Sequence, residues 1–166
     1  MANVGAAISY AMSWEDASGQ GVITEDDGGR TRYGIAEKYH PELTNSLFYS
    51  SMGATAAYQI AKSIYEIQYC EPLSIAEIAN QDIANKLLSL GINIGISRAS
   101  KMLQQAVGVA EDGVVGVHTL MALSKSETNE VLASLRASAE NYYVAVASDH
   151  PGDEMYLDGW LRRARA

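Results

Sequence analysis

The chain has 166 residues, which is enough to bury the core of one domain, and we expect no second full domain. Apolar residues make up 48% of it and charged residues 19%, as in ordinary globular proteins, which argues against a disordered chain. The formal charge of −8 excludes general electrostatic attraction to nucleic acid or to an anionic membrane surface.

The first residues lack the features of a signal peptide. Met1 to Val4 contains no basic residue, and the apolar run that follows is broken by Ser9, Tyr10 and Trp14. No segment is apolar over enough residues to cross a membrane. We therefore expect a protein made in the cytoplasm without a signal peptide and without membrane insertion, which needs another route if it acts outside the cell.

The first predicted element is a helix over residues 3–16. Asn3 is a favourable N-cap, and apolar residues recur at helical spacing up to Met12. Glu15 falls on the face that these residues would bury, where an unpaired carboxylate is rare. Burial favours the protonated form of a carboxylic acid, which is the form that a general acid needs. Glu15 is thus the first functional candidate, and a solvated helix end is the alternative.

A short β-hairpin is predicted next, over about residues 19–36. Residues 22–24 would form one arm, Asp27-Gly28-Gly29 the turn, and Thr31, Tyr33 and Ile35 would alternate along the second arm. Side chains at every second position share one face of a strand, so these three would point the same way.

From Thr44 onward the pattern is helical. Helices are predicted over 55–69 and 82–94, from Ser97 and from Val117, and over 127–148, with the helix at 82–94 as the centre of the core. Ser74 and Glu77 have the spacing of a capping box. Asn93 is either a buried polar group bonded internally or a contact to a ligand. The expected fold class is mainly α with a short β-hairpin near the N-terminus.

Metal, thiol and nucleotide chemistry find no support in the sequence. The three histidines are far apart, the single Cys70 has no histidine nearby, and Gly28-Gly29 lacks a phosphate-loop pattern. We therefore expect no metal and no cofactor. A carboxyl group at a helix end, a second one at a hairpin turn and the hydroxyl of Thr31 suit glycoside hydrolysis instead.

Several motifs resemble those of one family, the N-acetylmuramidases of glycoside hydrolase family 108. Trp14-Glu15 and the stretch from Asp26 to Ile35 are similar to its Trp-Glu-Gly-Gly and Asp-Pro-Gly-Gly-x-Thr-x-x-Gly-Ile motifs. Asn93-Ile94-Gly95 resembles its Asn-x-Gly. The stretches 103–108 and 112–120 resemble its Leu-Gln-x-Ala-Leu-Gly and Asp-Gly-x-x-Gly-x-x-Thr-Leu, and Gly159-Trp160-Leu161 fits its usual ending.

The resemblance implies roles for individual residues. Glu15 would be the general acid, Asp26 the second carboxylate by register with the glycine pair, and Thr31 the hydroxyl that orients water or substrate. Asp27 stands where the family has proline and competes with Asp26. Asp27, Tyr33 and Asn93 are candidates for substrate binding, although for Tyr33 packing in the core is favoured over stacking on a sugar. Asp16-Ala17 replaces the glycine pair that follows the glutamate in the family.

The resemblance also implies an organisation and a function. Residues 1–95 would be a lysozyme-like catalytic region with the hairpin, and residues 96–166 a helical peptidoglycan-binding-type region packed on it as one unit. The expected activity is cleavage of the β-1,4 bond between N-acetylmuramic acid and N-acetylglucosamine in glycan strands of the cell wall. Such an endolysin-like or wall-remodelling enzyme, from a phage or a bacterium, would reach the wall through a holin or a secretion machinery.

Two other functions remain open at this point. A catalytically silent module that binds the wall or serves assembly is suggested by the altered loop after Glu15 and by the acidic surface, which repels anionic wall polymers. A glycosidase acting on chitin-like polymers would use the same carboxylates on a neutral glycan.

Overall fold

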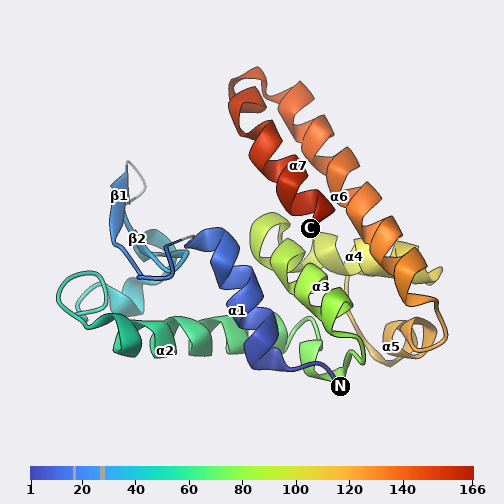
Figure 1. The fold of residues 1–166 in the computed structure, drawn as a ribbon, viewed down its shortest axis with the longest axis horizontal. Coiled ribbons are helices and arrows are strands. Elements are labelled where there is room, and N and C mark those ends of the chain that lie inside the picture. The colour runs from blue at the N-terminus through green and yellow to red at the C-terminus, as the bar shows by residue number, and fades with distance from the viewer. Residues whose placement is uncertain (17, 27–28) are drawn as a thin grey trace.

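The computed structural model describes residues 1–16, 18–26 and 29–166, and most of them are helical (Figure 1). The α-helices are α1 (Val4–Glu15), α2 (Ala54–Tyr65), α3 (Gln81–Ile94), α4 (Ile96–Val107), α5 (Val117–Leu123), α6 (Thr128–Asp149) and α7 (Leu157–Arg165). The strands are β1 (Thr24–Asp26), β2 (Gly29–Arg32) and β3 (Ile35–Ala36). Short 3-10 helices cover Glu37–Tyr39, Pro41–Leu43, Ile75–Glu77 and Pro151–Tyr156. The expected fold class, mainly α with a small sheet near the N-terminus, is confirmed.

The sheet differs in detail from the predicted hairpin. It has three antiparallel strands in the order β1-β2-β3, with Thr31 opposite Thr24 on one side and Ala36 on the other. The chain reverses at Tyr33 and Gly34, which have φ angles of 51° and 75°. The predicted second arm is therefore two strands, and the expectation that Thr31, Tyr33 and Ile35 share one strand face is wrong.

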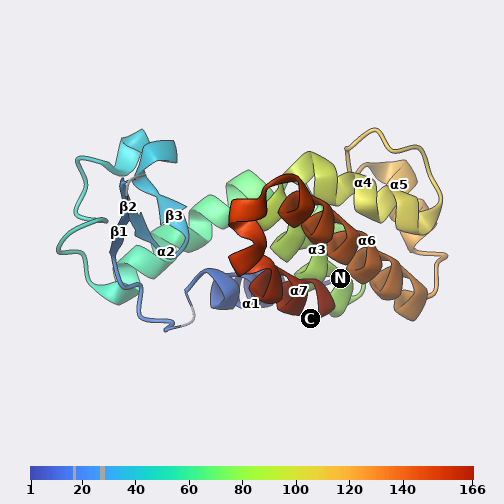
Figure 2. The ribbon, with the colours of Figure 1, turned by 90° about the horizontal axis from the view of Figure 1, so that it is seen from above.

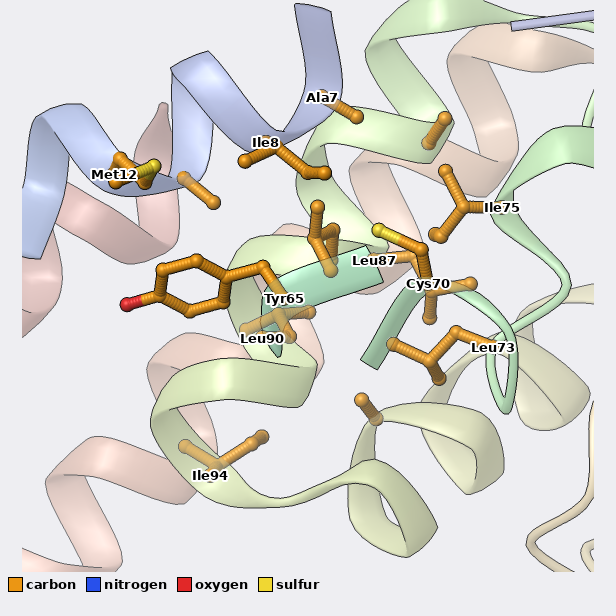
Figure 3. Packing of buried hydrophobic residues seen from close by; sticks show 14 of the residues in the cluster. Ala7, Ile8, Met12, Tyr65, Cys70, Leu73, Ile75, Leu87, Leu90 and Ile94 are labelled. Atoms are coloured by element: carbon orange, nitrogen blue, oxygen red, sulfur yellow. The ribbon is translucent and has the colours of Figure 1, made fainter. Parts of the chain in front are cut away.

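The core forms where α1 crosses α3. Ala7 and Ile8 of α1 face Leu87 and Leu90 of α3, and the ring of Tyr65 from α2 lies beneath Met12 (Figure 3). These side chains are almost completely removed from solvent, and burial of this kind is the main stabilising term in a domain of this size. The prediction that the helix at 82–94 is central to the core is confirmed.

The capping box predicted at Ser74 is replaced by another contact. Ser74 has a left-handed backbone with φ 51° and makes no capping bond; its hydroxyl donates instead to the carbonyl of Val115 at 2.9 Å, so the capping box with Glu77 does not form. The cap of α3 is Asn80, whose side chain accepts from the amides of Asp82 and Ile83. The helix at 55–69 is confirmed as α2 followed by a π-helical turn over Glu66–Cys70.

Two of the sequence motifs meet in one buried cluster beyond α3. The side chain of Gln104, 1% exposed, donates to Asp112 at 2.5 Å and to the carbonyl of Val114 at 3.0 Å, and it accepts from the amide of Gly113 at 2.9 Å. Its amide also lies 3.3 Å from the hydroxyl of Thr119. The motif around Asp112 is therefore explained by the fold: its polar side chains hold the turn between α4 and α5 against Gln104.

The helices beyond α3 share the core of the N-terminal part. Gly95 separates α3 from α4, and α6 and α7 lie side by side over α3 (Figure 2). The buried ammonium group of Lys86 on α3 donates to the carbonyls of Arg163 and Ala164 at 2.7 and 2.5 Å. No helix in the described part of the chain is both long and apolar enough to cross a membrane.

Candidate active site

Glu15 is the last residue of α1, at a meeting point of three parts of the molecule. The end of α1 lies between the sheet on one side and α7 on the other, in both views (Figures 1 and 2). The side chain of Glu15 is 22% exposed, so it is half-buried yet accessible from outside. The helix ends here because Asp16 leaves helical geometry while its amide still bonds the carbonyl of Met12.

An arginine from the far end of the chain is the direct partner of Glu15. The guanidinium of Arg163 on α7 donates to Glu15 Oε1 and forms an ion pair with it. The same guanidinium lies 5.7 Å from the centre of the Trp14 ring, within range of a cation–π contact. Arg163 is only 8% exposed, and within the described residues its Nε has no hydrogen-bond partner.

The backbone at Gly34 passes close to Glu15. A Cβ placed on Gly34 would lie 2.8 Å from the Cβ of Glu15 and 2.5 Å from the hydroxyl of Tyr65, and the φ of 75° also favours glycine. Tyr65 donates to the carbonyl of Tyr33 at 2.9 Å and so ties α2 to the turn before β3. The glycine of the Gly34-Ile35 motif thus lets the sheet approach the carboxylate.

Three tyrosines lie close enough to Glu15 for its charge to act on their phenol groups. Burial, followed by the Glu15 charge, raises the pKa of Tyr65 and of Tyr69. Burial also raises the pKa of Tyr143 to about 12, with the Arg163 charge opposing the rise. These phenols therefore stay protonated at neutral pH.

A hollow opens beside this ion pair, between the end of α1 and α7. It has a volume of about 450 Å³ and is lined by Trp14, Gly159, Trp160, Arg162 and Arg163. Both tryptophans are half-buried, and Trp160 stacks on Tyr143 with ring centres 5.6 Å apart. Rigid aromatic rings next to cationic donors are a common lining for sites that bind polar ligands.

Asp16 organises the loop that replaces the glycine pair of the family motif. Its carboxylate accepts from the amide and hydroxyl of Ser18 at 3.1 and 2.5 Å and from the amide of Gly21 at 2.6 Å. Burial acts to raise the pKa of Asp16, but these hydrogen bonds outweigh it and the pKa is lowered. Asp16 therefore has a structural role in holding the loop.

The predicted partners of Glu15 lie on the sheet. Asp26 ends β1, where its backbone pairs with Gly29, and Thr31 lies in the middle of β2, half-buried. Asp27, the competing second carboxylate, lies outside the described residues. The direct contact of Glu15 is with α7, which the sequence did not predict, and the roles of Asp26 and Thr31 stay predictions.

Two candidates for substrate binding have internal hydrogen-bond partners. Tyr33 is 4% exposed and donates to the carbonyl of Ala54 at 3.2 Å, so it packs in the core as favoured, and its role in substrate binding stays a prediction. Asn93 is exposed, so the expectation of a buried polar group is wrong. The oxygen of its side-chain amide accepts a hydrogen bond from the hydroxyl of Tyr143 at 2.6 Å.

Arg163 is the residue that sequence reasoning missed. In the sequence it is one of three arginines near the C-terminus, with Arg162 and Arg165. The available signal was its position on α7, between Trp160 and Ala164 on the face that packs on the core. A cation on such a face needs an anionic partner, and Glu15, the suspected buried carboxylate, was the matching candidate.

Over the part of the chain that the structure describes, no group of three His, Cys, Asp or Glu side chains is arranged to hold a metal ion. At the end of α1 the structure brings together the carboxylate of Glu15 and the guanidinium of Arg163.

The chain matches two known families. Residues 10–95 match the family described as Glycosyl hydrolase 108, and residues 98–165 match one described as a predicted peptidoglycan domain. The first match covers more than half of the chain, and the chain therefore belongs to the glycosyl hydrolase 108 family. It is a glycoside hydrolase, and the two matches together support peptidoglycan as its substrate. The resemblance found in the motifs is confirmed.

Among solved structures, that of Brucella abortus SagA is similar to this chain. The two are 22% identical, the alignment covers 97% of this chain and 92% of the other, and the TM-score is 0.67. At this identity the likeness concerns the fold, which the two chains share over nearly their whole length. None of the curated proteins matches the chain significantly.

Proposed function

We propose that this glycoside hydrolase is a muramidase that cleaves the β-1,4 bond between N-acetylmuramic acid and N-acetylglucosamine. Glu15 acts as the general acid that protonates the leaving oxygen, and a carboxylate of the sheet supports the water or the cationic sugar. The observation that carries this proposal is the position of Glu15, half-buried at the end of α1 beside an open hollow with aromatic walls.

A specific observation favours a second function, that of a silent module that binds the wall. In the free protein Glu15 is paired with a nearly buried arginine, as a carboxylate in a purely structural ion pair would be. The two functions differ in one product, because only the enzyme creates new reducing ends. Binding of the wild type to purified sacculi without new reducing ends would support the silent module.

The central test is Glu15→Gln, assayed by reducing ends released from sacculi. The amide keeps the shape of the side chain but cannot donate the proton, so we expect a loss of more than about 100-fold with an unchanged circular dichroism spectrum. Glu140→Gln is the matched control, since Glu140 also pairs with an arginine of α7, Arg165, and should keep full activity. Comparable turnover by a folded Glu15→Gln protein would overturn the assignment. Turnover of N-acetylglucosamine oligomers alone would indicate a chitin-type enzyme.

The second carboxylate can be assigned by comparing the turnover of variants at Asp26 and Asp27. If Asp26 supports the transition state, Asp26→Ala lowers turnover by about 100-fold or more, whereas Asp27→Ala acts through the turn and has the smaller effect. The reverse order would move the role to Asp27. Thr31→Val tests the hydroxyl in the same assay, because it keeps the β-branched shape of the strand residue.

The route to the wall is part of the same proposal. A muramidase made in the cytoplasm meets its substrate only after release through a holin or a secretion machinery. Expression in a bacterial host with and without a holin tests this, since lysis that needs the holin supports release and lysis without it contradicts the proposed route.

A further inference from the structure

The ion pair of Glu15 and Arg163 conflicts with the proposed role of Glu15 as a general acid. A guanidinium that donates to a carboxylate stabilises its ionised form, whereas a general acid must carry a proton. The pair therefore has to separate before Glu15 can act. Since Arg163 is 8% exposed, separation would leave a nearly buried cation without an anion, which is strongly unfavourable. Another anion must take the place of Glu15.

The surroundings of Arg163 determine where this second anion can bind. The carbonyl of Arg163 is held by Lys86, so the backbone is anchored and only the side chain reaches toward Glu15. The hollow of about 450 Å³ contains Arg163 in its wall, together with Arg162 and the two tryptophans. A ligand that enters it meets the partner of Glu15 directly.

The chemistry of the hollow selects one class of ligand. Aromatic rings suit the apolar faces of a sugar, and guanidinium groups suit a carboxylate. In a peptidoglycan strand the lactyl carboxyl group of muramic acid is free where the stem peptide is missing. Where the peptide is present, that group forms an amide with it and the peptide carries carboxylates of its own, while a chitin strand is neutral. Building on the proposed muramidase function, we propose that a carboxylate of the peptidoglycan strand binds Arg163 in this hollow and displaces Glu15, which then takes a proton from solvent.

In this arrangement the substrate itself converts Glu15 to the acid form. Arg163 makes the enzyme prefer glycans that bear a carboxylate, because a neutral glycan leaves the Glu15–Arg163 pair intact. The region that matches the peptidoglycan domain thus contributes a residue to substrate recognition at the catalytic centre and not only to attachment at the wall.

The test measures binding, without turnover, of two ligands that differ only in charge. These are the disaccharide N-acetylglucosaminyl-N-acetylmuramic acid and its carboxyl methylamide, titrated while the tryptophan fluorescence is followed. Glu15→Gln frees Arg163 from its internal anion, so we expect it to bind the acid at least about tenfold more tightly than the wild type does and to bind the amide equally well. In the double variant Glu15→Gln/Arg163→Met the preference for the acid should fall to within about twofold.

The controls separate this proposal from its alternatives. Glu15→Gln/Arg165→Met removes a positive charge from the same helix, but from the side that faces Glu140, and should keep the preference for the acid. A preference that persists without Arg163 overturns the proposal, as does a Glu15→Gln protein that binds the acid no more tightly than the wild type. The comparison of Glu15→Gln with the wild type tests the proposal even if the Glu15→Gln/Arg163→Met variant does not fold.

Failure of the proposed function gives a different result. Sacculi that gain no reducing ends while the acid preference depends on Arg163 would overturn the muramidase function and leave a carboxylate-binding site. Turnover of sacculi together with equal binding of acid and amide would overturn the binding proposal alone.

Discussion

The sheet lobe, residues 18–26 and 29–53, and the helical part, residues 54–166, are stabilised in different ways. In the lobe, buried Arg32 donates to the carbonyls of Gly21, Phe48 and Met52, each at 2.8 Å. In the helical part, apolar side chains from α2, α3, α4 and α6 form one contiguous cluster together with α1, and the lobe adds Tyr33, Ile35, Phe48 and Tyr49 to it. Three strands of two to four residues are too short to bury a core of their own, so the lobe uses a guanidinium to join its loops.

This difference has a consequence for the site. Glu15 ends a helix of the apolar core, while Asp26 and Thr31 belong to the lobe. We therefore expect the two halves of the site to rest on parts of the molecule with different local stability. A change in the lobe should alter the geometry of the site without unfolding the helices.

The largest effect is expected from the core. Leu87 is completely buried where α3 meets α1, and Leu87→Ala should lower the free energy of unfolding by about 2–5 kcal/mol. The loss should appear as a lower urea concentration at the midpoint of unfolding. The dependence of the free energy of unfolding on urea concentration should stay the same, because the core unfolds as a unit. A second transition in the variant would show that the helices do not share one cooperative core.

A smaller and more local effect is expected from Arg32→Met, which leaves three carbonyls of the lobe without their donor. We expect a loss of about 2–4 kcal/mol in the stability of the lobe, seen as faster amide exchange over residues 29–53 while α3 and α6 keep their protection. Arg30→Met is the control, because Arg30 is half-exposed and pairs with Glu37 at the surface, so its effect should be weaker. Equally fast exchange in α3 would contradict the proposed independence of the lobe.

The smallest effect concerns Lys86, a cation within the helical part. Burial, assisted by the charges of Arg136 and Arg163, lowers the pKa of Lys86 to about 8, against 10.5 for a free lysine. Between these two values the unfolded chain binds more protons than the folded one, so this group makes the free energy of unfolding rise with pH, by up to about 3 kcal/mol.

Denaturant titrations of the wild type and of Lys86→Met between pH 7.5 and 10 measure this effect. The difference between the two proteins isolates the contribution of Lys86 from those of the other titratable groups, which the two proteins share. A difference that stays constant over this range would show that Lys86 has an ordinary pKa in the folded protein.

Local signals in the sequence predicted the helices well. Asn3 caps α1 as expected, and Gly95 ends α3, because both depend on neighbouring residues only. Ser74 and Tyr33 were misjudged since tertiary contacts decide their backbones: Ser74 bonds Val115, and Tyr33 turns the chain where Tyr65 holds its carbonyl. Local spacing carries no information on such contacts.

In the candidate site, too, one residue could be predicted from a local pattern and the other could not. Glu15 could be singled out because its position on an apolar helix face is a local pattern. Its partner Arg163 is 148 positions away and belongs to a region with a different family description, so no spacing rule connects the two. The folded arrangement of α1 and α7 is needed to see the pair.

The single residue between α3 and α4 limits how this protein can be recombined. Residues matched by the two families are separated only by a short stretch around Gly95, yet they are joined by the contacts of Lys86 with α7, of Ser74 with Val115 and of Glu15 with Arg163. A chimera that exchanges one half for that of a distant relative would bring together a glutamate and a helix that were not selected as a pair. Shuffled libraries of such enzymes should therefore yield active members mainly when α1 and α7 come from the same parent.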